Sequence, residues 1–260
     1  MTRASLLLLV GCLHAEAPQR STAALKLERV LELKGDTYHV QGVDFDGQRV
    51  WVTSVDTPNR KGYLHEFSLK SGDLLRQVEV TDGVRFHPGG ISSDRTSLWI
   101  PVAEYRRNST SVIQRRNKRT LQIESQFPVS DHIGCIAVTS KLLVGGNWDS
   151  RDFYIWDQMG NFQRKVSSES NNAYQDIKFS SGALVASGLL ADRSGAVDWL
   201  DPASFHVLRR LAVGNTDRGA PYTREAMAVG PRQLLFVPED HPSRLFVFRL
   251  TPGKTATPRE

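Results

Sequence analysis

Ionisable and polar side chains recur at two positions of a pattern that repeats along this 260-residue chain. The first position precedes a short apolar segment and holds three of the seven histidines, His39, His87 and His132. The second position ends the next apolar segment and is mostly acidic, as at Asp56, Glu104, Asp149 and Glu239-Asp240. Histidines with carboxylates suit Zn²⁺ or general acid–base chemistry, whereas carboxylates, amides and carbonyls suit Ca²⁺. These residue types predict a ligand or metal site if the fold brings them together.

The repeat is clearest in FHPGGISSDRTSLWIPVAEYRR, residues 86–107, and related segments begin near residues 39, 131, 174 and 223. Each copy opens with polar residues and a small residue, then continues as a short apolar strand, a turn and a second strand. The small or polar position of the first strand is occupied by Gly42, Gly90, Cys135, Asp176 and Ala226. The steps between these positions are 48, 45, 41 and 50 residues. Four-stranded propeller blades have this period of roughly 40–50 residues.

Two further alternating segments follow each pair of strands, so each unit predicts four antiparallel strands. The last unit ends after its third strand, and a spare strand at residues 26–33 precedes the first unit. We therefore predict an all-β fold, a single five-bladed β-propeller over residues 26–250, in which the N-terminal strand closes the last blade. Closure leaves no open sheet edge. A six-bladed ring is the alternative, and it requires a sixth copy of the inner-strand pattern that the sequence does not contain.

In a closed ring, the starts of the inner strands and the ends of their hairpin partners meet at one mouth of the central channel. We predict that polar side chains from all the repeats line this mouth. The catalytic candidates are His87 and His132. The ligand-binding candidates are His39, Gln41, Gln175, Asn147 and Asp240. The metal-ligand candidates are Asp176, Glu225, Glu104 and Asp149, with Ca²⁺ the divalent cation expected first. The alternative is that these side chains bond to loop backbone and channel water.

Three tryptophans, Trp51, Trp99 and Trp148, fall on second strands, where core between blades is expected more than a sugar platform. Hydrophobic residues make up 40% and charged residues 23% of the chain, as in soluble globular proteins. The net charge of +5 is concentrated in the basic run from Arg106 to Arg119, which predicts either a solvated hairpin tip or a polyanion patch. No aromatic residues interleave with this run, so no nucleic-acid partner is expected. The common hydrolase and zinc signatures G-x-S-x-G, H-E-x-x-H and paired C-x-x-C are absent.

The N-terminus, residues 1–17, has the pattern of a leader, followed by a polar tether over residues 18–25. Its apolar run, Leu6 to Val10, is too short to span a bilayer. The segment Leu9-Val10-Gly11-Cys12 resembles a lipobox with lipidation at Cys12, and a cleavage site at residues 15–17 competes with it. We predict an exported monomer, either periplasmic, anchored to the outer membrane through Cys12, or secreted. Residues 251–260 are expected to be a disordered tail, and Cys135 to be a buried core residue without a disulfide.

Several motifs carry a family resemblance: HPGGI, WIPVAEYR, DHIG, NWDSRDFYIWD, YQDI and FVPEDHPSRLFVF. Together they resemble a family of exported β-propellers of unknown function over residues 26–250. The layout is also similar to metal-centred propeller hydrolases of the lactonase, apyrase and glycosidase types, whose catalytic motifs find no match here, so that similarity concerns the fold alone. We predict binding of a small ligand, a divalent metal, or both at the mouth. The alternatives are a metal-dependent hydrolase of the lactonase, phosphoester or glycosidase type, and a scaffold that contacts a partner protein through its blade edges or its basic run.

Overall fold

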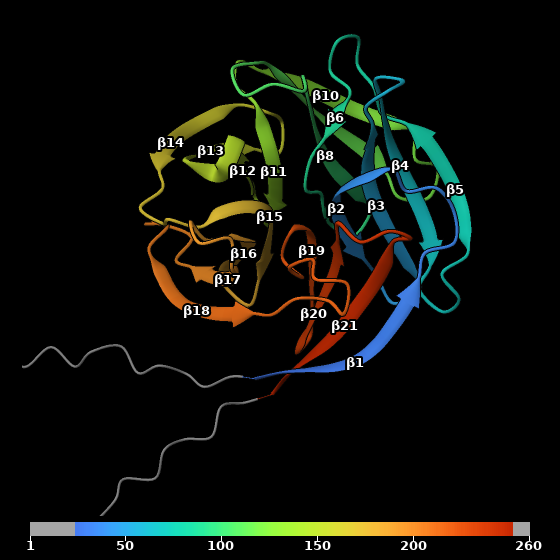
Figure 1. The fold of residues 1–260 in the computed structure, drawn as a ribbon. Coiled ribbons are helices and arrows are strands. Elements are labelled where there is room, and N and C mark those ends of the chain that lie inside the picture. The colour runs from blue at the N-terminus through green and yellow to red at the C-terminus, as the bar shows by residue number, and fades with distance from the viewer. Residues whose placement is uncertain (1–23, 252–260) are drawn as a thin grey trace, which may run out of the picture.

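The computed structural model describes residues 24–251, which form five antiparallel sheets arranged as blades around a central axis (Figure 1). Blade 1 contains β2 (His39–Phe45), β3 (Arg49–Asp56), β4 (Lys61–Ser68) and β5 (Leu74–Glu79). Blade 2 contains β6 (His87–Pro88), β7 (Ser92–Ser93), β8 (Ser97–Ala103), β9 (Ser111–Asn117) and β10 (Ile123–Val129). Blade 3 contains β11 (Ile133–Val138), β12 (Leu142–Asn147), the 3₁₀ turn η1 (Trp148–Ser150), β13 (Asp152–Asp157) and β14 (Phe162–Ser167). Blade 4 contains β15 (Ala173–Ser180), β16 (Ala183–Leu189), β17 (Gly195–Leu200) and β18 (Val207–Val213).

Blade 5 is closed by the N-terminal strand, as predicted. It contains β19 (Glu225–Gly230), β20 (Gln233–Pro238) and β21 (Arg244–Thr251), and β1 (Ala24–Glu32) is its outermost strand. β1 pairs antiparallel with β21 from Ala24↔Thr251 to Glu32↔Arg244, so the two ends of the described chain share one sheet (Figure 1). The five-bladed prediction is confirmed, and the ring extends slightly beyond residues 26–250. The last two residues of the expected tether belong to β1, and the leader with Cys12 lies outside the described residues.

Burial follows the order of the strands within each blade. All seven residues of β8 are buried, whereas β5 alternates between half-buried and exposed positions, as an outer strand with one solvated face should. The apolar faces of neighbouring blades pack together: Trp51 and Leu64 of blade 1 share a core cluster with Ile91 and Leu98 of blade 2. Cys135 is a free, buried thiol in the cluster between blades 3 and 4. Within the described residues no helix is both long and apolar enough to cross a membrane.

Glycines allow the inner strands to approach one another at the axis. A Cβ atom on Gly89 would lie 2.0 Å from the carbonyl oxygen of Gly134, and one on Gly90 would lie 2.5 Å from Asp176 Oδ1. The Gly90 N–H donates to Gly134 O at 2.8 Å, which joins blades 2 and 3 directly. Glycine is required at these two positions because no side chain fits there.

Asp176 joins the inner strands of several blades through its buried carboxylate. Oδ2 accepts the N–H of Val43 in blade 1 at 3.2 Å and the N–H of Met227 in blade 5 at 3.1 Å. Oδ1 accepts the N–H of Ile177 and forms an ion pair with Lys178, whose side chain is only 5% exposed. Burial raises the pKa of Asp176, and Lys178 and the backbone N–H groups oppose this effect. Asp176, predicted as a metal ligand, therefore lies within the ring with its oxygens already engaged.

We expect that a chain beginning at Leu33 is much less stable than one beginning at Ala24, because it lacks β1 and leaves β21 as an open edge. The half-buried Leu25 and Leu31 of β1 also pack against the core clusters. Losing these contacts should lower the free energy of unfolding by roughly 3 kcal/mol or more. Urea denaturation of both chains measures the difference, and equal midpoints would contradict closure by β1.

Asp176→Asn should destabilise the fold by about 3–5 kcal/mol, because it removes the ion-pair partner of the buried Lys178. Adding Lys178→Met should recover part of the loss, since it removes the unpaired charge. A double-mutant cycle from urea denaturation measures the coupling between the two residues. Wild-type stability of the single variant would refute the role assigned to this carboxylate.

Candidate functional site

A cavity of about 340 Å³ opens at one end of the central axis and receives residues from all five blades. It lies where the inner strands begin and the second strands end, as the repeat predicted. The lining residues are His39 and Gln41 of blade 1, His87 and Tyr105 of blade 2, His132, Gly134, Asn147, Trp148 and Asp149 of blade 3, Tyr174 and Gln175 of blade 4, and Glu225 of blade 5. Eight of the predicted site residues therefore share one cavity.

Irregularities in the inner strands coincide with residues of the cavity wall. The strand pairing of blades 1, 3 and 4 shifts register between Val40 and Gly42, between Ile133 and Cys135, and between Tyr174 and Asp176. The residue within each shift, Gln41, Gly134 or Gln175, lines the cavity. A β-bulge gives one strand an extra residue and redirects its side chain, and bulges are common beside functional sites. The fold thus turns the same position of three repeats toward the mouth.

One wall of the cavity is built from histidine and aromatic rings. His87 stacks on Tyr105 with centroids 4.5 Å apart, and His132 meets Trp148 edge-on at 4.6 Å. Desolvation lowers the pKa of His87 to about 3, and the neighbouring His132 and His39 add to the effect. The buried Nδ1 atom of His87 has no hydrogen-bond partner among the described residues. An uncharged ring with unused bonding capacity is available to a ligand.

His132 is also held uncharged, and its tautomer is defined. Burial lowers its pKa, although the carbonyl of Arg106 opposes this effect. Nδ1 of His132 lies 2.9 Å from that carbonyl oxygen, which can only accept, so Nδ1 carries the hydrogen and donates it. Nε2 is left with its lone pair. His132 therefore has the protonation state of a general base or a metal ligand.

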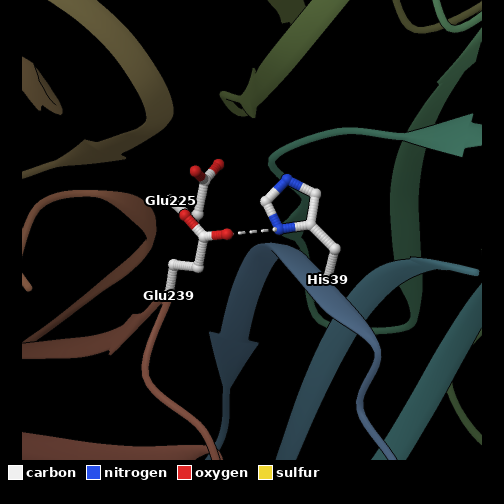
Figure 2. Close-up of side chains that lie close together, drawn as sticks. All are labelled: His39, Glu225 and Glu239. Carbon is white, nitrogen blue, oxygen red and sulfur yellow. Dashed lines mark ion pairs between the residues drawn. The ribbon is translucent and has the colours of Figure 1, made fainter. Parts of the chain in front are cut away.

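The acidic side of the mouth is formed by His39 at the start of β2 and two glutamates from blade 5 (Figure 2). Nδ1 of His39 lies 3.5 Å from Oε1 of Glu239, and one potential ligand atom each from His39, Glu225 and Glu239 lie within 4.8 Å of one another. Arg224 contacts both acids, at 2.5 Å from Glu239 Oε2 and 3.7 Å from Glu225 Oε1. Two chemistries fit this donor set: proton exchange with a ligand, and coordination of a divalent cation.

Glu225 combines burial with an uncommon backbone conformation. Desolvation and, to a smaller extent, the charge of Glu239 raise the pKa of its carboxyl group, Arg224 opposes both effects, and the result is a pKa of about 7. Its φ angle is 89°, in the region that L-residues rarely adopt. Strained residues persist where the surrounding structure enforces them, and they are frequent at active sites and ligand clamps. Glu225 is thus a cavity carboxyl that changes charge near neutral pH.

Three predicted site residues lie outside the cavity wall. Glu104 accepts hydrogen bonds from Thr110 and forms an ion pair with Arg106 at 2.8 Å. Its carboxylate therefore stabilises the loop between β8 and β9. Asp240 is buried between Arg218 and Arg244. Asp176 lies within the ring, as described above. Of the four metal-ligand candidates, Glu225 and Asp149 line the cavity, and Asp149 is paired with Arg107 at 2.6 Å.

The site also contains residues that the repeat did not single out as ligands. Glu239 was noted beside Asp240, yet it is Glu239 that faces His39 (Figure 2). Trp148 was expected in the core between blades, as observed for Trp51 and Trp99. Instead it opens the turn η1 after β12 and lines the mouth. The signal for Trp148 was its position beside Asn147 and Asp149, just beyond the end of the second strand.

Comparisons with known proteins agree with this architecture. The model of a family of unknown function, DUF6454, matches residues 53–178. Glutaminyl cyclase from Myxococcus xanthus has a similar structure, with a TM-score of 0.70 and 16% identity, over 90% of this chain and 99% of its own. The WD40 domain of Pan2 from Neurospora crassa gives a TM-score of 0.50 and 9% identity over 91% of this chain and 97% of its own. A chain of a nidogen/laminin complex has a TM-score of 0.51 and 14% identity, over 78% of this chain and 73% of its own. No curated protein sequence matches the chain.

These results confirm the predicted resemblance to propellers of unknown function. At such identities the structural similarities show the fold alone.

Glu225→Gln should stabilise the protein relative to wild type at high pH and have little effect at low pH. The folded-state pKa is raised from 4.5 to about 7, so burial of Glu225 becomes unfavourable as the pH rises through that window. Full ionisation of Glu225 should lower the free energy of unfolding of the wild type by about 3 kcal/mol, and the uncharged amide of the Glu225→Gln variant avoids this loss. Denaturation in the presence of a chelator, from pH 4 to pH 9, gives the difference curve. A difference that stays constant with pH would show that Glu225 has an ordinary pKa.

Proposed function

We propose that this propeller binds a small polar molecule of neutral or positive charge in the mouth cavity and exchanges a proton with it through Glu225. The observation that carries the proposal is the convergence of five blades on one cavity containing a buried carboxyl group with a pKa near neutrality. A cavity of about 340 Å³ is at the lower end of the range for small-molecule sites.

The expected charge of the ligand follows from the groups at the mouth. Burial lowers the pKa of His39, His87 and His132, so these rings supply no positive charge near pH 7. The arginines around the opening each face a carboxylate: Arg107 pairs with Asp149 and Arg224 with Glu239. An anionic ligand would therefore find no free cation, whereas an amine, an amide or a hydroxyl group would find acceptors.

The chemistry of such a site is proton transfer. A carboxyl group with a pKa near the working pH can donate a proton in one step and accept it in the next. His39 contacts Glu239, and the charge of Glu239 adjusts the pKa of Glu225, so the three groups respond to one another. The amides of Gln41, Gln175 and Asn147 line the same cavity and can orient a polar ligand.

The second candidate is a metal-dependent hydrolase, and the donor set His39, Glu225 and Glu239 favours it. One imidazole and two carboxylates are suitable ligands for Zn²⁺, and they leave coordination positions open. A bound metal would supply Lewis-acid activation of water or of a carbonyl group. In that case Glu225 would be ionised by the metal, whereas in the first candidate it carries a proton for much of the time near pH 7.

The glutaminyl cyclase of similar fold is an enzyme by name, which supports testing for catalysis and including peptides with N-terminal glutamine among the substrates. Export remains part of the proposal through the predicted leader.

The test begins with elemental analysis of the purified protein, followed by thermal-shift and NMR screening against amines, amides, sugars, lactones and N-terminal glutaminyl peptides, with and without chelator. We expect the ligands to be neutral or cationic, and Glu225→Gln to weaken binding or turnover at least tenfold. Glu169→Gln serves as the control, because that side chain is 75% exposed and lies outside the cavity. If the wild-type protein contains one equivalent of metal and the His39→Gln variant contains none, the metal-dependent hydrolase is favoured. Unchanged activity in Glu225→Gln would refute the assignment.

A further inference from the structure

A second hollow, a groove of about 540 Å³, lies between blades 1 and 2 on the face opposite the mouth. His39 of the mouth begins β2, whereas Asp46 of the groove follows the other end of this strand. The groove is lined by Asp46, Arg49, Trp51, Glu66, Leu75, Arg76, Arg95, Lys118 and Arg119. The basic run from Arg106 to Arg119 was interpreted as either a solvated hairpin tip or a polyanion patch. The structure divides it, since Arg106 and Arg107 lie at the mouth, beyond the opposite end of β9.

The groove has an excess of positive charge that its own carboxylates do not neutralise. Five cationic residues face two acidic ones. Glu66 is paired with Arg49 at 3.3 Å and with Arg76, and its side chain is only 3% exposed. Asp46 accepts the backbone N–H groups of its own turn. Among the described residues, no direct ion pair is formed by the side chains of Arg95, Lys118 or Arg119, although the charge of Lys118 also acts on the buried Asp44.

The turns that carry these three cations are fixed to one another by hydrogen bonds. The guanidinium of Arg76 donates to the carbonyl oxygens of Arg119 at 2.6 Å and Lys118 at 3.2 Å, and it is itself anchored to the buried Glu66. The N–H of Lys118 donates to Thr96 O at 2.9 Å, which links its turn to the turn that contains Arg95. The backbones of the turns that carry the cations are therefore fixed relative to one another, and ligand binding would require little ordering of the backbone.

Trp51 lines the groove and carries an unused hydrogen-bond donor. Its side chain is fully buried, and Nε1 has no hydrogen-bond partner among the described residues. Buried polar groups in proteins are almost always bonded, so an exception needs an explanation. Nζ of Lys118 lies 4.9 Å from the centre of the indole ring, so this cation of the groove packs over Trp51.

We propose that this groove binds a phosphate monoester group, with Arg95, Lys118 and Arg119 as its charged contacts. A monoester carries roughly one and a half to two negative charges near pH 7 and three acceptor oxygens, which matches three cations lining one groove better than a carboxylate does. The group can belong to a soluble phosphorylated molecule or to a lipid headgroup. This inference is independent of the mouth cavity and of the chemistry assigned to it.

Binding is tested with the full chain, using inorganic phosphate and glycerol phosphate for the soluble source. Vesicles of phosphatidylcholine with and without phosphatidic acid test the lipid source. In ¹H–¹⁵N spectra we expect glycerol phosphate to shift the indole N–H signal of Trp51, assigned with a Trp51→Phe variant, and to leave that of Trp148 unchanged. Sedimentation only with phosphatidic acid vesicles identifies the headgroup as the source. Binding of the soluble ester without sedimentation identifies a soluble ligand.

Arg95→Gln and Arg119→Gln, both at exposed positions, should each weaken binding roughly tenfold, as expected for the loss of one charge-assisted contact. Arg232→Gln is the matched control, because Arg232 is exposed in the β19–β20 turn, outside the groove. Thermal denaturation confirms that each variant is folded. The proposal is overturned if no phosphate species shifts the Trp51 signal, or if Arg232→Gln weakens binding as much as the groove variants do.

Discussion

The carboxylate of Asp176 is the interaction on which the arrangement of the inner strands depends. Five inner strands converge on one axis, and the N–H groups of Val43 and Met227 on their edges would otherwise lack a partner within the protein. Asp176 of blade 4 accepts such groups from blades 1 and 5, and it lies against Gly90 of blade 2. Lys178 supplies the counter-charge. The charge is therefore buried where a single residue contacts several blades, and Gly90 beside it leaves room for that contact.

The properties of the mouth follow from this close convergence. Because the strands meet tightly below the cavity, the polar groups above them are poorly hydrated, and desolvation is the first cause of every pKa shift at His39, His87, His132 and Glu225. The three histidines are thus kept uncharged over a wider pH range, and a glutamate that would be ionised in water is near its transition at pH 7. A site with these features is suited to recognising polar groups and transferring protons, and it accommodates anions poorly.

The blades and their closure could be predicted from the sequence because both depend on apolar periodicity and on repeat length, which are local properties. The same reasoning located His39, His87, His132 and Glu225 at one mouth. The prediction failed where a shift of one residue in strand register reverses the side of the sheet toward which a side chain points. Gln175 lines the cavity while Asp176 enters the ring, and Glu239 faces His39 while Asp240 is buried among arginines. A strand alternates its sides at every residue, and a bulge such as the one around Gln175 shifts that alternation without any mark in the composition.

The central claim is that the closed ring holds an uncharged carboxyl group at the mouth, ready to exchange a proton. The most direct measurement is the titration of Glu225 by ¹³C NMR in protein labelled at the glutamate carboxyl carbons, after metal removal, with Glu225→Gln to assign the signal. The account predicts a midpoint near pH 7. A midpoint at or below the ordinary glutamate value of about 4.5 would contradict it, because the mouth would then be hydrated and Glu225 permanently charged.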